Sequence, residues 1–297
     1  MSADSPAVRR ATIADLQSAR DANKKFAVVT AYDRATAEIA EAAGVGAILV
    51  GDSLAQVALG DESTVRIGME EMLHHVAAVV RSTSAPLVIA DMPFLSYADE
   101  AIAVSNAGRF IREAGAGAVK MEGGAEMASI TAALARSGAP VIGHIGLTPQ
   151  SALAEGRPRV KGRAPDAAEA LIADALALEA AGAAAIVIEL VPTELAAAIT
   201  ARVRIPTIGI GAGNGCSGQV QVMPDLLGLL AGRPPRHARP FATLREIAVS
   251  AVEAWRTEVE AGIFPGAAES IEGDEALRSA LAASSAGDPS GRGARRS

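Results

Sequence analysis

The sequence is poor in cysteine and in aromatic residues. Cys216 is the single cysteine among 297 residues, and only 3% of the residues are aromatic. One cysteine excludes an intramolecular disulfide and therefore a small secreted scaffold held together by disulfides. The N-terminal segment has no apolar core of a signal peptide, and no run of 18 apolar residues occurs. We therefore expect a cytoplasmic protein without a membrane partner.

An excess of basic residues is also missing. Lys and Arg number 27 against 34 Asp and Glu, which gives a net charge of −7, and the basic residues are spread along the chain. Such a distribution offers no basic stripe that could follow a phosphate backbone. The sequence predicts no nucleic-acid partner and favours small-molecule ligands.

Apolar residues are abundant, at 50% of the chain. With so few aromatics, the core must consist of Ala, Val, Ile and Leu, which is typical of parallel sheets buried on both faces. Short apolar runs alternate with helical periodicity. The expected strands are 27–32, 45–51, 86–91, 117–121, 140–145, 184–190, 206–210 and 219–223, and the expected helices are 34–43, 69–82, 99–114, 125–137, 166–181, 193–203 and 243–262.

Glycine-containing joints link many of these helices to the strands that follow. The segments EAAGVGA, REAGAGA and EAAGAAA each place a glycine where a helix would end and an apolar run would begin. Their recurrence indicates βα units, because parallel strands need crossover helices. We expect a (β/α)8 TIM barrel over residues 24–266, with a doubly wound open sheet as the alternative. Residues 1–23 are expected to form an N-terminal arm or helix. Residues 267–297 are expected to form an extension that is largely disordered after about 283.

Four acidic residues stand at or just after the ends of expected strands: Asp52, Asp91, Glu122 and Glu189. In a barrel the carboxyl ends of the strands form the functional face. Two aspartates from adjacent strands suit Mg²⁺, and Glu122 could complete the site directly or through water. Alternatively, each acid taken singly could be a helix cap or a solvated loop residue.

Two basic side chains accompany these acids. Lys120 lies two residues before Glu122, so both side chains point to the same face of the strand. A buried lysine needs an anion, which is either a substrate carboxylate or Glu122 itself. His144 ends the fifth expected strand and could hold a substrate oxygen, or could be a hydrogen-bonded core residue.

A glycine-rich segment does not indicate a nucleotide cofactor. Gly213, Gly215 and Gly218 have the G-x-G-x-x-G spacing, but the residues that follow, QVQVM, continue as a strand. A dinucleotide site needs a helix at this point.

Longer motifs resemble one known family, the ketopantoate hydroxymethyltransferases. The resemblance runs from about residue 24 to residue 266 and rests on the segments TAYD (30–33), VGDS (50–53), ADMPF (90–94), VKMEGG (119–124), GHIGLTPQS (143–151), DALALEAAGA (174–183), VPTELA (191–196) and IPTIGIGAG (205–213).

The resemblance implies a barrel of the phosphoenolpyruvate mutase/isocitrate lyase type and a homodecamer. It implies Mg²⁺-dependent transfer of a hydroxymethyl group from 5,10-methylenetetrahydrofolate to 3-methyl-2-oxobutanoate, through an enolate, to form 2-dehydropantoate for pantothenate and coenzyme A synthesis. The implied roles are metal binding for Asp52, Asp91 and Glu122, substrate binding for Asp52, Ser53, Asp91, Lys120 and His144, and proton acceptance for Glu189.

The sequence also departs from the family pattern. Val65 and Arg66 replace a common Leu-Pro pair, Leu190 replaces a common Cys, and Pro224 replaces a common His and is expected to disturb the eighth strand. A paralogue acting on another 2-oxoacid or one-carbon donor is one alternative function. A related C–C bond lyase is another, although such enzymes commonly carry a KKCGH-type cysteine loop that is absent here. A catalytically silent homologue is the third.

Overall fold

Eight parallel strands close into a barrel in the order of the chain. The structure is a computed structural model that describes residues 9–151, 154, 156 and 159–285. Because β1 pairs with both β2 and β8, no strand is left at an edge. The expected (β/α)8 barrel is therefore confirmed, and the open-sheet alternative is wrong. The strands are β1 Phe26–Thr30, β2 Ala47–Val50, β3 Leu87–Asp91, β4 Ala118–Glu122, β5 Val141–Gly146, β6 Ala185–Glu189, β7 Thr207–Ile210 and β8 Gly218–Gln221.

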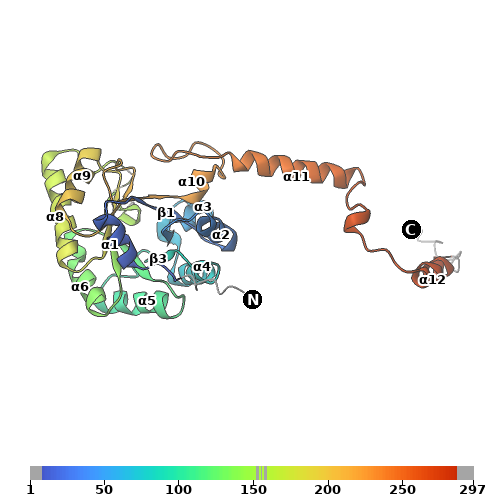
Figure 1. The fold of residues 1–297 in the computed structure, drawn as a ribbon, viewed down its shortest axis with the longest axis horizontal. Coiled ribbons are helices and arrows are strands. Elements are labelled where there is room, and N and C mark those ends of the chain that lie inside the picture. The colour runs from blue at the N-terminus through green and yellow to red at the C-terminus, as the bar shows by residue number, and fades with distance from the viewer. Residues whose placement is uncertain (1–8, 152–153, 155, 157–158, 286–297) are drawn as a thin grey trace, which may run out of the picture. The chain divides into compact units, whose positions relative to one another are not determined.

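Within residues 9–243, helices follow the strands and lie on the outside of the barrel (Figure 1). All seven expected helices are present, within a few residues of the predicted ends. They are α2 Arg34–Ala42, α4 Met69–Arg81, α5 Glu100–Arg112, α6 Ala128–Arg136, α8 Pro165–Ala180, α9 Thr193–Arg202 and α11 Leu244–Glu260. The other helical elements are α1 Ile13–Asp21, α3 Leu54–Val57, α10 Met223–Leu227, α12 Glu275–Ser285, and the 3₁₀ turns η1 Thr64–Arg66, η2 Ala125–Met127, η3 Pro149–Ser151 and η4 Ala267–Glu269.

The glycine joints have the backbone conformation expected of helix ends. Gly44 after α2 has φ +72° and Gly115 after α5 has φ +80°. This left-handed region costs glycine little and other residues more, so the helix ends there and the chain turns into the next strand.

Side chains alternate between the inside of the barrel and the surrounding helices. In β4, Ala118 packs with the residues inside the barrel, whereas Val119 and Met121 pack with the outer cluster. Since successive side chains of a strand point to opposite faces, Lys120 and Glu122 share the inward face with Ala118. The polar inward positions therefore lie at the carboxyl end of a strand whose other end is apolar.

Pro224 does not interrupt the eighth strand. β8 ends at Gln221, and Pro224 stands in the first turn of α10. Proline is well accommodated there, because the first backbone N–H groups of a helix have no intrahelical partner. The expected disturbance of the strand is wrong.

The chain divides into two compact units, Met1–Thr243 and Leu244–Ser297. The first contains the barrel, and the predicted boundary at residue 266 lies within the second. Helix α11 of the second unit contains no buried residue, and Trp255 on it is 52% exposed. The disorder predicted after about residue 283 concerns mainly residues 286–297, which lie outside the described residues. Residues 1–8 of the expected N-terminal arm also lie outside them.

Over the residues that the structure describes, no helix combines the length and the apolar character needed to span a membrane.

Candidate active site

The register of the barrel brings the predicted residues together at the carboxyl ends of its strands. Asp91 on β3 pairs with Lys120 on β4, and Glu122 pairs with His144 on β5. One strand further, Glu189 of β6 pairs with Gly146. Parallel strands in this register place their final side chains at one rim, as the sequence predicted.

Lys120 forms a buried ion pair with Asp91. Its Nζ donates hydrogen bonds to Asp91 Oδ1 at 2.6 Å and Oδ2 at 2.8 Å, and lies farther from Glu122 Oε1, at 3.7 Å. The expected internal partner, Glu122, is thus secondary to Asp91. Burial lowers the pKa of Lys120, but the charges of the nearby carboxylates outweigh it and raise the pKa above its usual value.

Asp52 follows β2 and is also buried, at 5% exposure. Its backbone N–H donates to Asp91 Oδ2 at 3.1 Å, which brings the two aspartates together. Burial and the charge of Asp91 raise the pKa of Asp52 to about 8, although Lys120 opposes this. Burial raises the pKa of Asp91 as well. The site therefore brings together more carboxyl groups than Lys120 can balance, so Asp52 keeps a proton at neutral pH.

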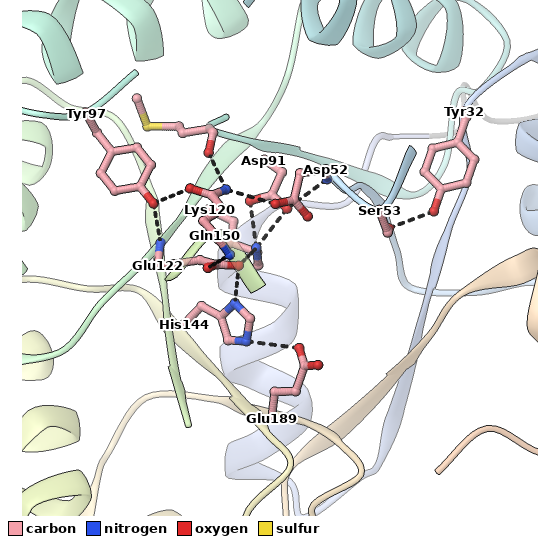
Figure 2. A network of polar contacts seen from close by, with 11 residues as sticks. Tyr32, Asp52, Ser53, Asp91, Tyr97, Lys120, Glu122, His144, Gln150 and Glu189 are labelled. Atoms are coloured by element: carbon pink, nitrogen blue, oxygen red, sulfur yellow. Dashed lines mark hydrogen bonds and ion pairs between the residues drawn. The ribbon is translucent and has the colours of Figure 1, made fainter. Parts of the chain in front are cut away.

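His144 lies between two carboxylates (Figure 2). Nδ1 donates to Glu122 Oε1 at 3.2 Å, and Nε2 lies 3.2 Å from Glu189 Oε2. The second contact is an ion pair only, because Nε2 makes no well-directed hydrogen bond to any described residue. Burial and Lys120 lower the pKa of His144, but the two glutamates outweigh them and raise it to about 9.

The backbone around Glu189 is tightly determined. A Cβ on Gly146 would collide with the carbonyl oxygen of Glu189, so only glycine allows this approach of β5 to β6. Leu190, the next residue, has φ +47°, a strained conformation for a residue with a side chain. Its N–H donates to the Ile210 carbonyl and its own carbonyl accepts from Lys161 N–H, both at 2.9 Å, which holds the strained turn in place.

Three residues of this network were not singled out from the sequence: Tyr32, Tyr97 and Gln150. Tyr32 OH is 2.9 Å from Ser53 Oγ, and Tyr97 OH donates to Gln150 Oε1 at 2.5 Å. The chain contains only two tyrosines, and each follows a strand end, Tyr32 after β1 and Tyr97 after β3. The rule that located the acids would therefore have located Tyr32, two residues after β1, but not Tyr97, six residues after β3. Gln150 had no such signal, because it lies in a loop of unknown path.

All seven predicted site residues line one cavity of about 990 Å³. They are Asp52, Ser53, Asp91, Lys120, Glu122, His144 and Glu189. None of the four acids is the N-cap of the helix that follows it, so the capping alternative is wrong.

Basic side chains line the outer part of this cavity. Arg159 comes from the segment before α8, and Arg233, Arg236 and His237 come from the segment after α10. The three arginines are exposed, whereas Asp52, Asp91 and Glu122 at the barrel end are buried. The cavity therefore has an acidic interior, balanced in part by Lys120, and a basic outer lining.

The donor set suits a hard divalent cation. Asp52 and Asp91 are buried and adjacent, and the pKa of each is raised, as expected of cation-binding carboxyl groups in the absence of the cation. Among the described His, Cys, Asp and Glu side chains, no group of three or more has the arrangement of a metal site. Mg²⁺ is nevertheless usually held by one or two carboxylates, with water and substrate oxygens completing its shell, so the two aspartates fit this ion chemically.

Comparison with known proteins connects the chain to one family. The model of the ketopantoate hydroxymethyltransferase family matches residues 10–267. A protein of Chloroflexus aurantiacus named 3-methyl-2-oxobutanoate hydroxymethyltransferase is 52% identical, over 90% of this chain and 95% of its own length. One of the same name from Gluconacetobacter diazotrophicus is 50% identical, over 88% of this chain and 94% of its own length.

Solved structures share the fold at much lower identity. A phosphonopyruvate hydrolase, solved as a complex with oxalate and Mg²⁺, is 18% identical with a TM-score of 0.59, covering 93% of this chain and 99% of its own. A 2,3-dimethylmalate lyase of the PEP mutase/isocitrate lyase superfamily is 17% identical with a TM-score of 0.55, covering 91% and 98%. These structures therefore share the barrel fold of this chain.

Proposed function

This chain belongs to the ketopantoate hydroxymethyltransferase family and is a transferase, and we propose that it transfers the one-carbon unit of 5,10-methylenetetrahydrofolate to 3-methyl-2-oxobutanoate, forming 2-dehydropantoate. The observation that carries the proposal is the presence of Glu189 and a buried acid–lysine cluster on one cavity. Glu189 can remove a proton from carbon, and the acid–lysine cluster can bind a 2-oxoacid together with a cation. The product would serve the synthesis of pantothenate and coenzyme A.

Lys120 and Ser53 are the proposed ligands of the substrate carboxylate. An ammonium group has three donors, and the two contacts of Lys120 with Asp91 leave one for an anion. The Ser53 hydroxyl lines the same cavity and is steadied by Tyr32. Both contacts would fix the substrate with its C3 proton toward the base.

Asp52 and Asp91 are the proposed magnesium ligands, with Glu122 beside them. Bound Mg²⁺ would polarise the 2-oxo group, which makes the C3 proton more acidic. The raised pKa values of the two aspartates support this assignment, because a bound cation would offset the burial and repulsion that raise them.

Glu189 is the proposed base that accepts the C3 proton. At 14% exposure of its side chain it is more accessible to a substrate than Glu122, at 3%. Because its pKa is raised to about 9, His144 is positively charged at neutral pH, and its Nε2 faces the carboxylate of Glu189 at 3.2 Å. Glu122 fixes the ring from the other side, so His144 positions the base.

The outer part of the cavity is the proposed folate site. The volume of the whole cavity, about 990 Å³, lies near the upper end of the roughly 300–1,000 Å³ typical of ligand pockets, which supports the binding of two substrates. Arg159, Arg233 and Arg236 suit the carboxylates of the folate glutamate, because guanidinium groups bind carboxylates in a bidentate manner.

The proposal extends to a homodecamer in the cytoplasm. Exposed apolar residues on α11, such as Ile247 and Trp255, support burial of this helix in an assembly. The single cysteine supports a reducing compartment.

Two assays test the function. Purified protein with Mg²⁺ should exchange the C3 proton of 3-methyl-2-oxobutanoate in D₂O. Proton NMR measures this exchange. With methylenetetrahydrofolate added, 2-dehydropantoate should form. Exchange without product would indicate a paralogue that uses another one-carbon donor, and the absence of both would refute the proposed chemistry.

A further inference from the structure

We propose that Gln150 is a positioning residue that holds Asp52 and Glu122 in the arrangement that binds the divalent cation and the 2-oxoacid. Gln150 belongs to the loop after β5, within the turn η3. It does not need to touch the reacting atoms to act in this way. The inference rests on the proposed function, since it assigns a role in the same site.

The side-chain amide of Gln150 uses all of its donor capacity on fixed partners. Nε2 donates to Asp52 Oδ2 and to the Met92 carbonyl, both at 3.0 Å. Oε1 accepts from Tyr97 OH at 2.5 Å (Figure 2). At 3% exposure, the residue cannot exchange these partners for solvent.

The three partners admit only one orientation of the amide. If the amide were flipped, Oε1 would face the carboxylate of Asp52 and the carbonyl of Met92, which are both acceptors. Tyr97 reinforces the observed orientation, because its hydroxyl donates to Oε1. Gln150 thus presents N–H groups, and never oxygen, to Asp52.

The backbone of Gln150 holds a second carboxylate. Its N–H donates to Glu122 Oε2 at 2.9 Å, so one loop residue connects the acid after β2 with the acid that ends β4. The other oxygen of Glu122 is held by His144, and both oxygens of Asp91 are held by Lys120. Among the described residues, no donor bonds to Asp52 Oδ1, which leaves this oxygen available to a cation.

Loss of the Gln150 amide should therefore act on the cation site. Gln150 is the one described residue that donates to the carboxylate of Asp52, so without the amide this carboxylate can rotate away from its binding orientation. Removal of residues that orient metal ligands typically weakens metal binding or activity by about 10- to 100-fold.

The chain offers a closely matched control in Gln17 on α1. Its Nε2 also donates to a carboxylate, Asp21 Oδ1 at 2.8 Å, and to a backbone carbonyl, that of Arg204 at 3.0 Å. Gln17 does not line the cavity. Gln150→Met and Gln17→Met thus remove the same kind of hydrogen bonds inside and outside the site.

The experiment measures Mg²⁺ affinity of the full chain by calorimetry, together with the Mn²⁺ EPR spectrum and the kinetics of C3 exchange. We expect Gln150→Met to weaken Mg²⁺ binding by about 10- to 100-fold and to raise the KM of the oxoacid, with a changed Mn²⁺ spectrum. Gln150→Glu keeps the shape but cannot donate to Asp52, and should weaken binding at least as much. Gln17→Met should match the wild type.

Two further outcomes separate this inference from the proposed function. Equal Mg²⁺ affinity in Gln150→Met and Gln17→Met, with a wild type that binds Mg²⁺ and catalyses exchange, would overturn the inference alone. A wild type that neither binds Mg²⁺ nor catalyses exchange would overturn both. If Gln150→Met does not fold, Tyr97→Phe removes the bond that orients the amide, together with a longer bond, at 3.4 Å, that Tyr97 OH accepts from the backbone N–H of Glu122. It should weaken Mg²⁺ binding in the same direction, and wild-type affinity in this variant would equally overturn the inference.

Discussion

His144 Nε2 lies 3.2 Å from Glu189 Oε2, and Glu189 keeps more of its side chain exposed than Glu122, the other partner of the ring. One imidazole therefore separates a glutamate that is locked within the acid cluster from a glutamate that faces the cavity. This separation explains how acids of one rim can have different roles.

The first prediction concerns this accessible glutamate. Glu189→Gln should lower the rate of C3 proton exchange by about 10²- to 10⁴-fold, the range expected for loss of a general base. Because Glu189 is not among the proposed cation ligands, Mg²⁺ affinity should be unchanged. Proton NMR in D₂O and calorimetry measure the two quantities. Glu194→Gln, at an exposed position of α9, is the control. Undiminished exchange in Glu189→Gln would show that another group is the base.

The second prediction concerns the pH dependence of stability. The pKa of Asp52 is raised from 3.8 to about 8, so the folded protein keeps a proton that the unfolded chain loses near pH 4. The resulting stability is fully present below about pH 4 and is lost as the pH rises to 8. The side chain of Asp52→Asn does not ionise, so this variant should not lose stability in this way between pH 4 and 8. It should be more stable than the wild type by several kcal/mol at pH 8 without Mg²⁺, since each tenfold change in acidity between pH 4 and 8 corresponds to about 1.4 kcal/mol.

Urea unfolding between pH 4 and 8 measures this difference. Addition of Mg²⁺ should stabilise the wild type but not Asp52→Asn, because only the former keeps the carboxylate. Parallel pH curves for the two proteins would show that Asp52 is not held protonated by its surroundings.

The third prediction concerns the ion pair between Lys120 and Asp91. Lys120→Met leaves a buried carboxylate without its cation and should cost about 3–5 kcal/mol of unfolding free energy. The double variant with Asp91→Asn should recover most of this loss. Arg34→Met, which breaks an exposed pair with Glu38, should cost less than about 1 kcal/mol. Urea unfolding distinguishes these cases, and additive losses in the double variant would mean that the two side chains are not coupled.

The fourth prediction concerns the basic lining of the cavity. Arg236→Gln should raise the KM for methylenetetrahydrofolate roughly fivefold, as expected from loss of about 1 kcal/mol, without changing the KM of the oxoacid. Arg239→Gln is the matched control, because Arg239 stacks on Phe241 and does not line the cavity. Steady-state kinetics with each substrate varied in turn provides the test. Equal changes in both variants would place the folate elsewhere.

Much of the fold was predictable from local patterns. Alternating apolar runs and glycine joints such as Gly44 and Gly115 are properties of short segments, and the barrel follows from their repetition. The acids were located for the same reason, since a residue that follows a strand must lie at the rim. Pro224 misled the prediction because its effect depends on whether it falls in the strand or in the first turn of the next helix, a difference of a few residues.

The partners within the site were less predictable. The internal partner considered for Lys120 was Glu122, its neighbour on the same strand, but Lys120 binds Asp91 across the register with β3. Gln150 reaches Asp52 from a position nearly a hundred residues later in the chain. Such contacts depend on strand register and loop path, which are set by the packing of the whole barrel and not by any local segment.

The pairing of Phe26 with Gly218 has a consequence for how the protein is made. β1 leaves the ribosome early, but its second neighbour, β8, is synthesised only near the end of the barrel. At about 5–20 residues per second, the first strand must wait roughly ten seconds or longer for this partner. Until then, the nascent sheet has two open edges of the kind that promote aggregation. A chain that stops before Gly218 should therefore depend on chaperones, whereas completion of the last strand protects both edges at once.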